Sequence, residues 1–153
     1  MNTSNLTHLG KVSVIETNPD KAILDPIPNP SPGYLYCCRF TAPEFTSLCP
    51  KTGQPDFAMI VIDYVPDKFL LESKSLKLFL FAFRNRGDFH EKCTADIGDR
   101  IAQAISPRWM RVAGFWNGRG GISIDVVCEY GTLPANVRPL SIDNIKLYNN
   151  GHG

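Results

Sequence analysis

One apolar stripe limits what this chain can fold into. Between residues 88 and 105 apolar side chains recur at every fourth position, at Phe89, Cys93, Ile97, Ile101 and Ile105. This period is that of an α-helix that buries one face. Asp88 is placed to act as its N-cap, with Glu91 three residues later as in a capping box, and Pro107 ends it. We therefore expect one amphipathic helix packed on a core.

The segments on both sides of this helix indicate a sheet and one more helix. Their β-branched and aromatic content predicts four strands, at residues 34–41, 57–65, 108–116 and 122–130. The run 73–85 is too uniformly apolar to be assigned from its period, and we assign it as a helix because Ser73 can cap it and Leu, Lys and Ala favour helices. The order β-β-α-α-β-β predicts an α+β fold, a four-stranded antiparallel sheet with two helices on one face. Its open edges favour oligomerisation.

Two further segments stand out by composition. Residues 1–33 hold five of the twelve prolines, and because proline lacks a backbone donor we expect an extended arm there. Residues 34–153 are expected to form a single domain around one core. The polar linker 43–56 between the first two strands is long for a compact domain, and such loops are often functional.

The charge balance and the cysteines narrow the function classes. Sixteen Lys and Arg against 15 Asp and Glu leave a net charge of +1, so we expect no direct nucleic-acid partner. No apolar run reaches the roughly 20 residues of a membrane span. The first residues lack a signal-peptide pattern. Five irregularly spaced cysteines favour reduced thiols, and we expect a cytoplasmic protein.

A few residues could carry chemistry, each with an ordinary alternative. Cys49, on the polar linker, could be an exposed nucleophile or a buried loop cysteine. Asp56 could be functional or a turn aspartate. His90, the one histidine outside the terminal segments, could bind a substrate or be solvated. Lys74 and Lys77 share a helix face and could bind phosphates or face solvent.

The sequence contains no common nucleotide or protease motif. The glycine-rich run 118–121 follows an expected strand but precedes another strand, whereas a dinucleotide fingerprint opens a helix. A nicotinamide cofactor, if bound, is therefore not held by a Rossmann unit. No P-loop, His-Glu-x-x-His or Gly-x-Ser-x-Gly pattern is present either.

Three segments together resemble the NADPH-dependent 7-cyano-7-deazaguanine reductases, the nitrile reductases of queuosine biosynthesis. They are residues 44–58, 72–79 and 83–91. The second, Glu-Ser-Lys-Ser-Leu-Lys-Leu-Phe, matches the family signature Glu-[Ser/Leu]-Lys-[Ser/Ala]-apolar-Lys-[Leu/Tyr]-aromatic in full. The hairpin run 119–124 also fits, whereas Lys51 and Gly118 depart from the pattern at loop positions.

The resemblance implies a role for each matching residue. Cys49 would add to the nitrile carbon, Asp56 would protonate the nitrogen, and His90 belongs with both the catalytic and the substrate-binding groups. The deazaguanine would be held by Leu71, Glu72, Ser73, Phe89, His90 and Glu91. Lys74 and Lys77 fall in the motif associated with NADPH, of which two molecules are used per turnover. No metal is implied.

The resemblance also implies an assembly and a product. The family adopts the tunnelling fold, in which β-β-α-α-β-β subunits join their sheets into a barrel with active sites between subunits. A chain of one module is expected to form a homo-oligomeric decamer of two pentamers. The nitrile of 7-cyano-7-deazaguanine would become the primary amine of 7-aminomethyl-7-deazaguanine through a covalent cysteine thioimide, within the pathway of queuosine tRNA modification.

Other interpretations of the same residues remain open. Cys49, His90 and Cys93 could supply three ligands to a catalytic zinc, as in a tunnelling-fold hydrolase of a purine or pterin similar to GTP cyclohydrolase I. The chain could also be a purine-binding oligomer without catalysis. Finally, Cys93 could form a reversible disulfide with Cys49, or it could simply pack in the helix stripe.

Overall fold

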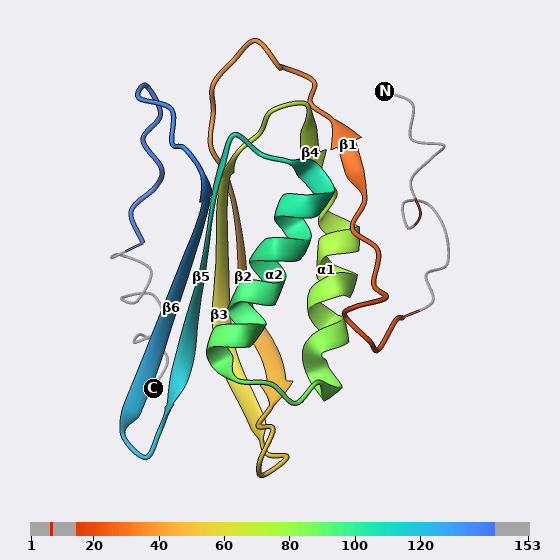
Figure 1. Cartoon of the computed structure of the whole chain (residues 1–153), viewed down its shortest axis with the longest axis vertical. Coiled ribbons are helices and arrows are strands. Elements are labelled where there is room, and N and C mark those ends of the chain that lie inside the picture. Colours follow the sequence, from red (N-terminus) through yellow and green to blue (C-terminus); the bar gives the residue numbers. More distant parts are fainter. Residues whose placement is uncertain (1–6, 8–14, 143–153) are drawn as a thin grey trace.

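The computed structural model describes residue 7 and residues 15–142. Two helices, α1 (Ser73–Phe81) and α2 (His90–Ile105), cover one face of a four-stranded antiparallel sheet (Figure 1). A short 3-10 helix (Ala82–Asn85) continues α1. In spatial order the strands of the sheet are β2 (Cys38–Leu48), β3 (Pro55–Val65), β5 (Trp109–Arg119) and β6 (Ile122–Gly131).

This arrangement confirms the predicted α+β fold and the order of its four long strands and two helices. Two short strands, β1 (Pro26–Pro28) and β4 (Phe69–Leu71), were not predicted, and they pair with each other in a separate antiparallel sheet. The long linker predicted over 43–56 is wrong, because β2 and β3 continue toward each other and leave only the turn 49–54. Most of the polar residues in that segment thus belong to the end of β2, the start of β3 or the turn between them.

Both predicted helix caps need correction. The N-cap of α1 is Glu72 rather than Ser73, and its carboxylate accepts hydrogen bonds from the backbone N–H of Lys74 and of Ser75. The N-cap of α2 is Phe89, without a side-chain bond, rather than Asp88. The carboxylate of Asp88 instead accepts a charge-assisted bond from Arg86, which is stronger than a bond from a neutral backbone group.

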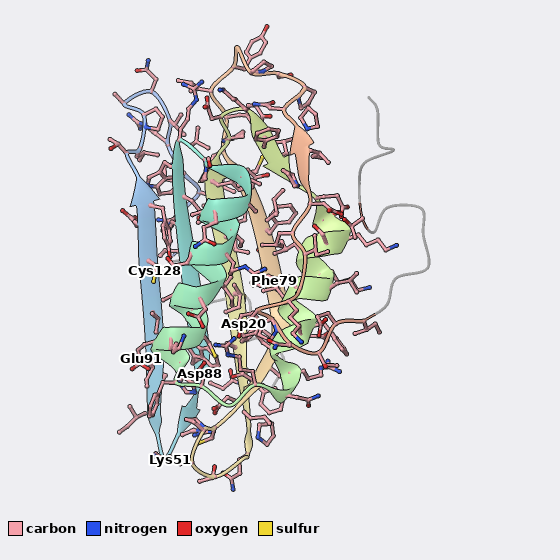
Figure 2. All side chains as sticks on the ribbon, turned by 45° about the vertical axis from the view of Figure 1, so that its right-hand side comes forward. Asp20, Lys51, Phe79, Asp88, Glu91 and Cys128 are labelled. Carbon is pink, nitrogen blue, oxygen red and sulfur yellow. The ribbon has the colours of Figure 1, made fainter. Side chains whose placement is uncertain are left out.

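The core lies between the helices and the sheet. Four residues of the predicted stripe, Cys93, Ile97, Ile101 and Ile105, are fully buried there, and α1 contributes Leu76 and Phe79. The fifth, Phe89, is 60% exposed because it stands at the N-cap of α2, so its predicted burial is wrong. Phe79 lies between the two layers in Figure 2. From the sheet, the core receives residues of β2, β3 and β5, including Phe45, Ile60, Val112 and Trp116. Burial of this apolar surface holds both helices on the same face.

The other face of the sheet carries a buried charge cluster and the chain that follows β6. Asp63 is fully buried and accepts hydrogen bonds from Arg39 and Arg111. Both arginines also donate to the carbonyl oxygen of Leu140, so residues 132–142 lie on this side of the sheet, opposite the helices (Figure 1). Among the residues described, no helix is long and apolar enough to cross a membrane.

Candidate active site

The pairing of β2 with β3 brings Cys49 close to Asp56. Ser47 of β2 lies opposite Asp56 of β3, and Cys49 begins the turn just beyond. The backbone N–H of Cys49 donates to the carbonyl oxygen of Gln54, and the N–H of Gly53 donates back to the carbonyl of Cys49. Gly53 has a φ of 69°, a conformation that favours glycine. The nucleophile candidate therefore sits on a closed turn.

The sulfur of Cys49 is partly exposed and surrounded by hydrogen-bond donors. The hydroxyl of Thr52, the guanidinium of Arg119 and the backbone N–H groups of Thr52 and Lys51 lower the pKa of this thiol to about 6. Since the thiolate is the reactive form, a lowered pKa keeps the nucleophile charged at neutral pH. This environment favours a reactive cysteine over a buried loop cysteine.

Arg119 connects the two candidate catalytic residues. It is the last residue of β5, and its guanidinium pairs with a carboxylate oxygen of Asp56 as well as with the sulfur of Cys49. The bond to Cys49 raises the pKa of Arg119. No role for Arg119 was predicted from the sequence, although the residue lies in the hairpin run 119–124 that fits the family. Its place beside Cys49 depends on the pairing of β3 with β5.

Asp56 is a buried carboxylate that also contacts His90. It is 4% exposed, and its Oδ1 lies 3.2 Å from Nε2 of His90. Its Oδ2 is buried and has no hydrogen-bond partner among the residues described. A buried carboxylate oxygen is costly to leave unpaired, and an exception of this kind is typical of a functional position. The structure thus brings Cys49, Asp56 and His90 together at one end of the sheet.

The neighbours of His90 lie at the same end of the molecule. Phe89 is 60% exposed and Glu91 is exposed, so both side chains face outward at the start of α2. Figure 2 shows Glu91 and Asp88 at the end that carries Lys51 of the β2–β3 turn. Exposed aromatic and carboxylate groups at this end of the molecule are suited to contact a planar, hydrogen-bonding ligand.

The remaining predicted substrate residues lie elsewhere in the chain. Leu71 and Glu72 are buried where β4 leads into α1, and this end of α1 is remote from the β2–β3 turn (Figure 1). Ser73 and Lys77 line a cavity of about 330 Å³ between α1 and β2, whereas Lys74 is not part of its lining. Within the single chain, the predicted site residues therefore form two separate groups.

The cysteine proposed as a third zinc ligand lies in the core. Cys93 is fully buried, and burial raises the pKa of its thiol to about 11. Across residue 7 and residues 15–142, no group of three His, Cys, Asp or Glu side chains is arranged to hold a metal ion. Cys49, His90 and Cys93 are thus not gathered as a ligand set. Cys49 and Cys93 are both free thiols, and a disulfide between them stays a prediction.

Comparison with known proteins places the chain in a family. A family model described as "QueF-like protein" matches residues 55–135. The Brucella anthropi protein named "NADPH-dependent 7-cyano-7-deazaguanine reductase" is 59% identical over 134 residues, which cover 88% of this chain and 86% of that protein. A Brucella ovis protein of the same name is 58% identical with the same coverage. The chain belongs to the family of NADPH-dependent 7-cyano-7-deazaguanine reductases.

Membership in this reductase family confirms the resemblance that the motifs indicated. A solved structure, the crystal structure of the archaeosine synthase QueF-Like in the apo form, supports the fold. It superposes with a TM-score of 0.59 and 23% identity, and the match covers 64% of this chain and 96% of that chain. At this identity the likeness concerns the fold alone.

The lowered pKa of the reductase's Cys49 thiol predicts how alkylation of the protein depends on pH. Iodoacetamide should modify Cys49 with a midpoint near pH 6, because the thiolate predominates above that pH, whereas an ordinary cysteine titrates at roughly 8.5. Replacing either donor side chain, in Thr52→Val or Arg119→Gln, should raise the midpoint. Peptide mass mapping across pH measures the rate at each cysteine.

An exposed arginine on the segment after β6 supplies the control for this experiment. Arg138→Gln should leave the midpoint where it is in the unmodified protein, since Arg138 lies outside the donor set around Cys49. A wild-type midpoint near that of an ordinary cysteine, or no shift in either donor variant, would contradict the described environment of the thiol.

Proposed function

We propose that the chain uses NADPH to reduce the nitrile of 7-cyano-7-deazaguanine to the primary amine, through a covalent thioimide on Cys49. One observation carries the proposal: a partly exposed thiol with a pKa lowered to about 6 is linked through Arg119 to a buried carboxylate. A nitrile carbon accepts hydride poorly, but a thiolate adds to it when the nitrogen is protonated. The activity is the one named for the Brucella relatives.

The first step joins the sulfur of Cys49 to the nitrile carbon. One π bond of the nitrile becomes a lone pair on nitrogen, and that nitrogen takes one proton, which leaves a neutral thioimide. Asp56, protonated at the moment of addition, is the proton donor, because its Oδ2 has no other partner in the described structure. His90, 3.2 Å from the other oxygen, is placed to return a proton to the carboxylate.

The cavity between α1 and β2 has the chemistry to hold NADPH. Lys77 and Arg84 provide two cationic groups against one acidic residue, Glu44, and the Arg84 guanidinium lies 4.6 Å from the centre of the Phe81 ring. Cations suit the phosphates, and the apolar wall suits a heterocyclic ring. When bound, NADPH supplies the hydride for each of the two reductions. The four-electron change from nitrile to amine accounts for two NADPH per product.

Residues from both groups, at the start of α2 and at the start of α1, take part in substrate recognition. Glu91 accepts from the two adjacent N–H donors of the guanine-like edge, and the exposed ring of Phe89 stacks on the heterocycle. Leu71, Glu72 and Ser73 complete the pocket, with Lys74 beside Lys77 in the cofactor motif. Because these residues lie at the remote end of the same subunit, a neighbouring subunit supplies them. A site with such polar pairing rejects analogues that lack the edge.

The assembly that joins the two groups is the tunnelling-fold barrel. β2 and β6 are the edge strands of the sheet, and Ile122 and Val127 are exposed on β6. Unpaired edges of this kind favour pairing with another chain. We infer a decamer of two pentameric rings in which β2 of one subunit meets β6 of the next. The five free cysteines suit a cytoplasmic location.

The proposed chemistry predicts the stoichiometry of the reaction and its dependence on Cys49. Addition of 7-cyano-7-deazaguanine should drive the oxidation of two NADPH per amine formed. Cys49→Ala should abolish this oxidation, since no thioimide can form, yet still bind the nitrile. Absorbance at the NADPH band and calorimetric binding measure the two quantities. Steady NADPH oxidation by Cys49→Ala would contradict covalent catalysis.

Sites shared between subunits predict that two inactive variants can restore each other. Cys49→Ala and Glu72→Gln damage opposite ends of the subunit, so their coexpression should produce some intact sites, about a quarter of all sites in a randomly mixed ring. Coexpression of Cys49→Ala with Asp56→Asn is the matched control, because both changes lie at the same end and should restore nothing. NADPH oxidation by the purified mixtures decides between the arrangements. Equal inactivity of both mixtures would contradict sites between subunits.

A further inference from the structure

The indole of Trp116 lies flat against the imidazole of His90. The two ring centroids are 4.0 Å apart and the ring planes differ by 7°. Trp116 is 2% exposed and belongs to β5, where it lies opposite Ala58 of β3 and Ile124 of β6. The tryptophan is therefore fixed by the sheet on both sides, and it presents one rigid aromatic face to His90.

Thr94 of α2 forms hydrogen bonds to both His90 and Trp116. Its hydroxyl donates to the carbonyl oxygen of His90 at 2.9 Å, and its oxygen accepts from the indole N–H of Trp116 at 3.2 Å. Thr94 is fully buried. Because the bond between Thr94 and the indole is buried, it fixes the first turn of α2 relative to Trp116.

Gly114 and Phe45 pack closely against this unit. A side chain at Gly114 would place its Cβ 2.6 Å from the hydroxyl of Thr94 and 2.9 Å from the indole nitrogen of Trp116. Phe45 meets Trp116 edge-on, with ring centroids 5.7 Å apart and an interplanar angle of 87°. A side chain at position 114 would therefore collide with Thr94 and Trp116, and Phe45 packs against the indole as well.

The orientation of His90 decides which group its ring nitrogen reaches. Its imidazole side chain is 12% exposed, and Nε2 lies 3.2 Å from Oδ1 of Asp56. With one face of the imidazole covered by the indole, rotation of the ring away from Asp56 would break the stack. Aromatic stacking of this kind contributes beyond simple burial.

We propose that Trp116 and Thr94 are positioning residues for His90. The indole fixes the plane of the imidazole, and Thr94 fixes the distance between the start of α2 and β5, so that Nε2 stays against the carboxylate of Asp56. This inference rests on the proposed function, because the proton supply through His90 and Asp56 belongs to it. Neither residue contacts the substrate in this role.

Paired substitutions test the positioning role. Trp116→Leu should lower kcat by roughly 10- to 100-fold, the scale of a misplaced catalytic group, and leave the KM for the nitrile nearly unchanged. Trp116→Phe keeps an aromatic face and should retain most of kcat. Thr94→Val removes both hydrogen bonds and should lower kcat, whereas Thr94→Ser should restore it. Trp109→Phe, a buried tryptophan in the separate cluster with Val65 and Val137, is the control.

A spectroscopic measurement tests the stack without any turnover. The chain has two tryptophans, so in a Trp109→Phe background the emission reports Trp116 alone. Replacing His90 by Leu in that background should shift this emission and its near-ultraviolet circular dichroism, because the ring that covers the indole is gone. Urea unfolding of each variant confirms that the comparison concerns folded protein.

Several outcomes would overturn the inference. These are an unchanged kcat in Trp116→Leu, equal losses in Trp116→Leu and Trp116→Phe, a loss confined to KM, or an emission unaffected by the His90 change. Failure of the proposed function looks different, since the wild-type protein would then not oxidise NADPH with the nitrile. In that case the emission still reports on the stack.

Discussion

The position of β3 between β2 and β5 is the constraint on which the candidate site depends. Its pairing with β2 sets Asp56 beside the turn of Cys49, and its pairing with β5 sets Trp116 and Arg119 at the same end. A shift of one residue in either register would turn Asp56 to the opposite face of the sheet. The burial of β3 on both faces therefore fixes the chemistry as well as the core.

Arg119 allows two acidic groups to lie close to one another. A thiolate and a carboxylate would repel each other at short range, and a guanidinium between them offsets that repulsion through directed hydrogen bonds. Arg119 is 43% exposed at its side chain, so it meets solvent as well as both acids. Loss of the sulfur charge on thioimide formation would leave Arg119 paired to Asp56 alone. In the proposed first step the negative charge thus moves from the sulfur of Cys49 to the carboxylate of Asp56, and Arg119 keeps an anionic partner throughout.

Much of the fold followed from periodicity, and much of the site did not. The helix α2 was predictable because its apolar residues recur at a fixed spacing, whereas α1 was predicted from the helix propensity of its Leu, Lys and Ala residues. The extent of β2 and β3 was not, since the polar residues near their ends look like a loop when strand partners are unknown. The predicted N-caps were wrong for a similar reason, since their partners are not evident from the sequence. Asp88 is bonded to Arg86, and Glu72 instead of Ser73 accepts the hydrogen bonds at the start of α1.

The candidate site likewise contains residues that could be predicted from the sequence and residues that could not. Cys49, Asp56 and His90 could be chosen from residue type and from motifs that resemble the family. Arg119 and Trp116 could not be assigned roles, because strand pairing brings Arg119 to its partners and the packing of α2 on β5 brings Trp116 to His90. Intact-protein mass after mixing with 7-cyano-7-deazaguanine in the absence of NADPH tests the central claim most directly. We predict a covalent adduct of the substrate's mass that is lost in Cys49→Ala, and an unmodified wild-type mass under the same conditions would contradict the account.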